Sequence, residues 1–115
     1  FRANPKLQNI DNVFSGCGLL TGGLDGQLFA RNAKLKTARE TFHGCSGLNG
    51  EMSGALFTST NNPLLTNFYQ TFQGCKNIQG TAPSLWTQFS NANGGGCFNG
   101  CTKLSNYADI PSQWK

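Results

Sequence analysis

Thiols are the most reactive side chains that this sequence repeats at a regular spacing. The string Phe-x-Gly-Cys occurs four times and ends at Cys17, Cys45, Cys75 and Cys101, at intervals of about 28 residues. A thiolate can ligate zinc or attack an electrophile. Whether the four thiols converge on one point therefore decides what chemistry they can do.

A regular series of thiols favours neither a metal site nor disulfides. Repeats stacked in register would place the four cysteines one above another, about 4.8 Å apart. Zinc needs ligands that surround one point, usually from paired spacings, and thiols that all point the same way meet disulfide geometry poorly. We therefore expect no metal and no cofactor, and interpret Cys17, Cys45, Cys75 and Cys101 as a structural cysteine ladder of small buried residues. Cys97 lies outside the ladder and is expected to be the most accessible thiol.

The remaining ionisable residues do not form a recognisable catalytic set. His43 is the only histidine, and the equivalent positions in the other copies hold Ser15, Gln73 and Asn99. The acids are Asp11, Asp25, Glu40, Glu51 and Asp109. No two of them occupy equivalent positions in neighbouring copies, as a carboxylate pair would require, and His43 has no acidic orienting partner in an obvious register. The sequence therefore predicts a protein that is not an enzyme.

The composition argues against two classes of partner. Charged residues make up 12% of the 115 residues, about half the usual share, and the formal net charge is +4. The basic residues form no dense run with interleaved aromatics, so we expect no nucleic acid partner. No apolar stretch approaches the roughly 20 residues of a membrane span, so we expect no membrane insertion.

The spacing of apolar residues predicts a short helix in each copy. The helices would begin at Asn4-Pro5, Asn32-Ala33 and Asn62-Pro63, with asparagine as the N-cap, and would end at Gly16, Gly44 and Gly74. Apolar residues follow at i, i+3 and i+7, which is typical of one helix face. These residues are Leu7, Ile10 and Phe14, then Leu35, Ala38 and Phe42, and then Leu65, Phe68 and Phe72.

A short strand is predicted after each helix. Leu20 and Leu24, Leu48 and Met52, and Ile78 and Ala82 are evenly spaced, which suits a strand with one buried face. The sequence thus predicts an α/β solenoid, a leucine-rich-repeat-like stack of about four short helix-plus-strand coils of about 28 residues, with a parallel sheet on one face and a C-terminal cap. The single domain 1–115 would divide into repeats at about 1–29, 30–57 and 58–86 and a capping unit at 87–115. Because the chain begins inside a repeat, we expect it to be the C-terminal part of a longer protein.

The ordered markers of the repeat resemble a known family. Asn-Pro-x-Leu, Thr-Phe-x-Gly-Cys, Leu-x-Gly and Leu-Phe follow one another in the order found in the BspA-like branch of bacterial leucine-rich-repeat proteins. The ending from "GTAPSLWTQF" to "DIPSQWK" resembles the terminal unit of phage-type members. The resemblance covers essentially the whole chain. It implies a place in a virion tail or on a bacterial cell surface, or a secreted protein.

The sequence predicts a non-catalytic binding or adhesion module. It would be the distal part of a phage tail fibre or tip protein, or of a bacterial surface adhesin, with a protein or glycan on a host or neighbouring cell as its partner. The alternative is a structural spacer or assembly repeat with no ligand of its own; homo-oligomers could form through the missing N-terminal part. The expected contacts are the outward-facing side chains of the predicted sheet, Thr21, Asn49, Glu51, Gln79, Thr81, Ser105 and Tyr107.

Overall fold

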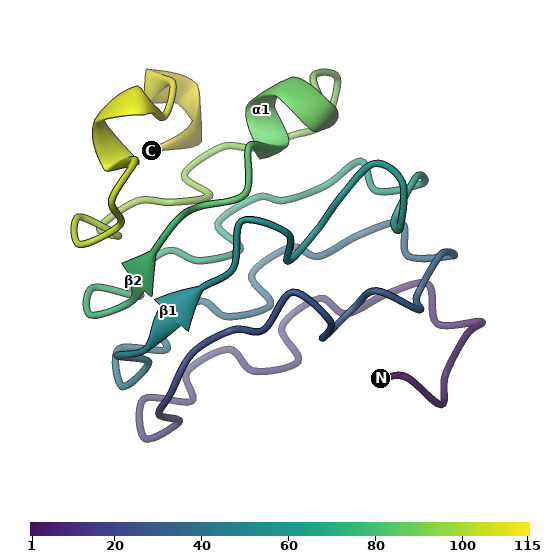
Figure 1. The fold of residues 1–115 in the computed structure, drawn as a ribbon, viewed down its shortest axis with the longest axis horizontal. Coiled ribbons are helices and arrows are strands. Elements are labelled where there is room, and N and C mark those ends of the chain that lie inside the picture. The colour runs from purple at the N-terminus through teal and green to yellow at the C-terminus, as the bar shows by residue number, and fades with distance from the viewer.

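Regular secondary structure is scarce in this chain. The computed structural model describes all 115 residues and contains two paired parallel strands, β1 (Glu51–Met52) and β2 (Gln79–Gly80). The one α-helix is α1 (Leu85–Gln88), and two 3-10 helices, η1 (Tyr107–Asp109) and η2 (Ser112–Trp114), end the chain. Turns and loops connect these elements into a flat body of 32 × 29 × 19 Å (Figure 1). None of the helices has the length and apolar character that crossing a membrane requires.

The predicted α/β solenoid of four helix-plus-strand coils is therefore wrong. The three segments predicted as helices, 4–16, 32–44 and 62–74, contain turns and single bridge residues and no helix. Two strands of two residues each replace the predicted sheet. The one α-helix, α1, lies where no helix was predicted.

Backbone hydrogen bonds show what stands in place of the helices. In the first copy, the amides of Val13 and Cys17 donate to the carbonyls three residues earlier, at 3.3 and 3.1 Å, and so close turns. The amides of Asn12 and Phe14, on either side of Val13, donate instead to the carbonyls of Arg39 and Thr41 of the next copy, at 3.0 and 2.8 Å. Of 61 backbone hydrogen bonds, 60 lie outside regular helices and strands. Turns within a copy and bonds between copies therefore hold the fold together.

This alternation explains why the helix prediction failed. A series of turns closed by i to i−3 hydrogen bonds presents an apolar residue inward every three or four positions, as a helix does. Asn12, Glu40 and Gln70 occupy equivalent positions within the three copies and have φ angles of 59°, 53° and 50°. A right-handed helix cannot continue through such a left-handed residue. The apolar spacing is thus that of consecutive turns.

Neighbouring copies of the repeat lie side by side and pair in parallel. Glu51 pairs with Gln79 across β1 and β2. Single bridges join Asn9 to Thr37, Thr37 to Asn67 and Asn67 to Asn93, one copy after another. Figure 1 shows these segments as successive passes of the chain in two layers, with β1 and β2 in one of them.

Phenylalanine side chains fill the space between the two layers in two columns. Phe14, Phe42, Phe72 and Phe98 stack in sequence with ring centroids 5.3, 5.6 and 5.4 Å apart and interplanar angles of 9°, 4° and 11°. Phe1, Phe29 and Phe57 form the second column, at 5.1 and 5.0 Å. Offset stacked rings combine burial of a large apolar area with a favourable ring geometry. The Phe of each Phe-x-Gly-Cys string therefore builds the core.

Two of the three asparagines predicted as helix N-caps connect neighbouring copies instead. The side-chain amide of Asn32 donates to the carbonyls of Phe1 and Asn4, at 2.8 and 3.0 Å. The amide of Asn62 donates to the carbonyls of Phe29 and Asn32, at 3.0 and 3.2 Å. Both asparagines are fully buried. They satisfy turn carbonyls that would otherwise lose their hydrogen bonds on burial.

Trp114 covers the core at the C-terminal end. Its ring lies 6.1 Å from that of Phe68, and its carbonyl accepts a hydrogen bond of 2.8 Å from the Phe98 amide. Gly94 occupies the position equivalent to the buried Phe68, and a Cβ at Gly94 would lie 2.1 Å from a Trp114 ring carbon. The missing side chain of Gly94 thus makes room for Trp114.

Candidate binding surface

Seven side chains predicted as ligand contacts come from four consecutive copies. We call them the polar strip: Thr21, Asn49, Glu51, Gln79, Thr81, Ser105 and Tyr107. Six are exposed, and Tyr107 in η1 is half-buried. The parallel register places Glu51 beside Gln79, while a hydrogen bond of 2.8 Å from the Ser105 amide to the Gly80 carbonyl places the last copy beside β2.

Hydrogen bonds hold several members of the polar strip in place. The Asn49 side-chain oxygen accepts from the Gly22 amide at 3.2 Å, and the Gln79 side-chain amide donates to the Asn49 carbonyl at 3.2 Å. The Thr81 and Ser105 hydroxyls are 3.1 Å apart and share a hydrogen bond. The surface is therefore ordered before a ligand arrives, which lowers the entropic cost of binding.

Glu51 and Tyr107 give the polar strip its only charge and its only aromatic ring. The one salt bridge of the molecule joins Arg39 to Glu40, so the Glu51 carboxylate has no cationic partner. The Lys115 ammonium lies 4.9 Å from the Tyr107 ring centroid, on its face. A carboxylate and exposed hydroxyls and amides can accept and donate hydrogen bonds to sugar hydroxyls or to a peptide backbone.

The cysteine ladder forms hydrogen bonds between copies. The thiols of Cys45, Cys75 and Cys101 are fully buried, and each donates to the carbonyl of the preceding copy's phenylalanine, at 3.0, 3.2 and 3.1 Å. Burial raises the pKa of all three, and that of Cys101 to about 12. A thiol that holds its proton so firmly is a poor nucleophile and a poor metal ligand.

The predicted accessibility of two thiols is wrong. Cys97 is fully buried, because it occupies the position equivalent to the buried Thr71, and burial raises its pKa well above the ordinary thiol value. Cys17 is the exposed cysteine. Cys17 occupies the position equivalent to Cys45, whose thiol contacts Phe14 of the preceding copy, but in the structure no preceding copy lies against Cys17. Aligning the last copy from Phe98 backwards would have shown that Cys97 falls on a buried position.

The structure brings together no group of three His, Cys, Asp or Glu side chains that could hold a metal ion. His43 is half-buried and makes no side-chain hydrogen bond or ion pair. The Asp11 carboxylate joins its copy to the next, since it accepts hydrogen bonds from the Thr37 hydroxyl at 2.6 Å and the Arg39 amide at 2.8 Å.

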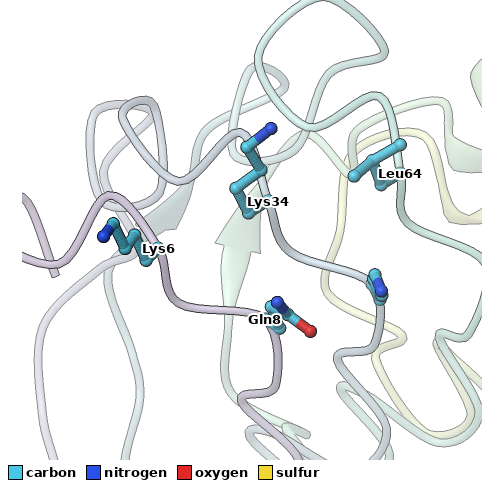
Figure 2. A pocket seen from close by; sticks show the side chains of 5 residues that line it. Lys6, Gln8, Lys34 and Leu64 are labelled. Atoms are coloured by element: carbon cyan, nitrogen blue, oxygen red, sulfur yellow. The ribbon is translucent and has the colours of Figure 1, made fainter.

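Sequence reasoning missed a hollow on a different part of the surface. Five residues line this lysine hollow, of about 440 Å³: Lys6, Gln8, Lys34, Lys36 and Leu64 (Figure 2). None of them belongs to the polar strip. The sequence did contain a pattern that indicates two neighbouring lysines, because Lys6 and Lys34 occupy equivalent positions two residues after Asn4 and Asn32.

Comparisons of the chain with protein-family models, with curated proteins and with solved structures found no match.

Proposed function

We propose that this chain is a non-catalytic binding module that recognises a glycan or protein on a cell surface through the polar strip. The observation that carries the proposal is the ordered array of exposed amides, hydroxyls and one carboxylate across four neighbouring copies. Regularly spaced polar groups on a fixed backbone can match the repeated hydroxyls of a glycan or an extended peptide. The resemblance to BspA-like repeats supports a place on a virion tail or a bacterial surface, as part of a tail fibre, a tail tip or an adhesin.

A structural spacer is the second function that an observation favours. The side chains of Asn49, Gln79, Thr81 and Ser105 already form hydrogen bonds within the molecule. In a spacer, these bonds would serve only to join neighbouring copies, and specificity would belong to another part of the protein.

A glycan array together with binding to intact bacterial cells separates the two functions. The wild-type chain should bind a restricted set of glycans or cells. The double variant Glu51→Ala/Gln79→Ala should lose this binding, because it removes adjacent polar groups from the centre of the polar strip. Thr60→Ala is the matched control, since Thr60 is exposed outside the polar strip and its side chain makes no hydrogen bond.

A chain that binds nothing in either assay is a spacer. Binding that survives in the Glu51→Ala/Gln79→Ala variant contradicts the assignment of the site to the polar strip. Both variants should keep the wild-type melting temperature, because all three substituted residues are exposed.

A further inference from the structure

We propose that the lysine hollow is a second binding site, for an acidic polysaccharide that carries carboxylate or sulfate groups. It is separate from the polar strip, so the proposed function does not depend on it. Three of the nine Lys and Arg residues of the chain line this one hollow of about 440 Å³. Lys6 and Lys34 come from equivalent positions in neighbouring copies, and Lys36 follows two residues after Lys34.

The backbone fixes the spacing of these lysines. The Lys36 amide donates to the Gln8 carbonyl at 2.8 Å, and the Thr66 amide donates to the Lys36 carbonyl at 3.0 Å. Three copies are therefore hydrogen bonded side by side beneath the hollow, at the spacing of about 4.8 Å that neighbouring strands have. Figure 2 shows Lys6 and Gln8 on one pass of the chain, Lys34 on the next and Leu64 beyond it. The three cations thus lie on two neighbouring copies, Lys6 on the first and Lys34 and Lys36 on the second.

The charges of these three lysines are not neutralised within the protein. The one salt bridge of the molecule joins Arg39 to Glu40, and the one lysine ammonium that donates a hydrogen bond to another side chain is that of Lys103. No acidic residue lines the hollow. The hollow therefore carries uncompensated positive charge, which attracts an anion.

The other lining residues favour a sugar polymer over other polyanions. Gln8 offers an amide to a hydroxyl group, and Leu64, which is 42% exposed, offers an apolar patch to the face of a sugar ring. No aromatic side chain lines the hollow, as stacking of nucleic acid bases would require. A membrane surface would call for a larger apolar face than one leucine. Cations on two neighbouring copies also match charges repeated along a polymer better than a single small ion does.

Isothermal titration calorimetry of the full chain at low salt tests this site with four probes: heparin for sulfate groups, polygalacturonate for carboxylates, dextran as the neutral polymer and sodium sulfate as the free ion. We expect heparin or polygalacturonate to bind, dextran not to bind, and sodium sulfate to compete only weakly at equal charge. The variant Lys34→Gln/Lys36→Gln should weaken polymer binding roughly tenfold. Lys76→Gln, which removes an exposed lysine outside the hollow, should change it little.

Three results would overturn the proposal. The first is that neither acidic polymer binds. The second is that Lys76→Gln weakens binding as much as the double variant does, which would indicate diffuse attraction to a basic protein. The third is that sodium sulfate competes as well as the polymer, which would indicate an ion site only. The polar-strip variant Glu51→Ala/Gln79→Ala should bind heparin or polygalacturonate as the wild type does. The proposal for the lysine hollow and the proposal for the polar strip are therefore tested independently.

Discussion

At the scale of single residues, the five cysteines differ in how deeply they are buried. Cys45, Cys75, Cys97 and Cys101 are buried, whereas Cys17 is exposed. Iodoacetamide under native conditions should therefore modify Cys17 and spare the other four, as mass spectrometry of the tryptic peptides would show. Modification of Cys97 at the rate of Cys17 would contradict the placement of Cys97 at a buried position of the repeat.

The buried thiols also predict a loss of stability in alkali. Burial raises the pKa of Cys101 from the ordinary 9.0 to about 12, so between these values the unfolded chain loses a proton that the folded chain keeps. Folding is therefore unaffected by this thiol below pH 9 and becomes less favourable as the pH rises towards 12. Each such thiol lowers the free energy of unfolding by about 1.4 kcal/mol per pH unit over its range.

Urea unfolding at a series of pH values from 8 upwards measures this effect. Cys101→Ala should flatten the decline in the free energy of unfolding above pH 9, whatever its effect at neutral pH. Cys17→Ala is the control, because Cys17 is exposed and should leave the slope unchanged. Equal slopes in wild type and Cys101→Ala would show that this thiol does not hold its proton in the folded state.

At the scale of elements, close approach of the backbones decides which glycines are essential. A Cβ at Gly47 would lie 2.4 Å from the Gly18 carbonyl oxygen of the preceding copy, whereas the nearest atom to a Cβ at Gly54 is a Thr81 methyl carbon at 3.8 Å. Gly47→Ala should cost about 3 kcal/mol in urea unfolding, because the two copies must move apart. Gly54→Ala should cost nothing or stabilise slightly. If both substitutions were neutral, neighbouring copies would not pack as closely as described.

The elements also show where sequence reasoning succeeded and where it failed. Most of the predicted apolar positions are buried, Ile10, Leu35 and Phe68 among them, but Leu20, predicted to face inward, is 38% exposed. The left-handed glycines were predicted correctly, with φ near 75° at Gly16 and Gly44. The element type was wrong because turns and helices share the spacing of three to four residues. What distinguishes them is the left-handed φ of residues such as Asn12 and Glu40, and neither residue type demands that conformation.

The candidate sites were predictable to different degrees. The outward positions of the polar strip follow from the alternation of buried and exposed residues around Met52 and Ala82. The lysine hollow required the register between copies, which brings Lys6 beside Lys34 and Lys36 although 28 residues separate Lys6 from Lys34. Spacing alone did not show that three copies enclose a hollow there.

At the scale of the whole molecule, Trp114 and Gly94 form a matched pair that covers one end of the core. Trp114 is 5% exposed, so Trp114→Ala should cost about 3–5 kcal/mol and lower the melting temperature. Gly94→Ala should also be costly, since its Cβ would collide with the indole ring. In the Trp114→Ala background, Gly94→Ala should cost much less, which a double-mutant cycle measures. Additive effects would show that the two residues do not meet.

Recognition of a ligand by the polar strip is tested most directly by two-dimensional ¹H–¹⁵N NMR of the labelled chain, titrated with a glycan that the array identifies. We predict that backbone amide shifts change in residues 49–51 and 79–81, which include the first residue of β1 and all of β2, and stay constant in residues 6–8 and 34–36 when the glycan is uncharged. Changes confined to residues outside the polar strip, with 49–51 and 79–81 unaffected at saturation, would contradict the claim.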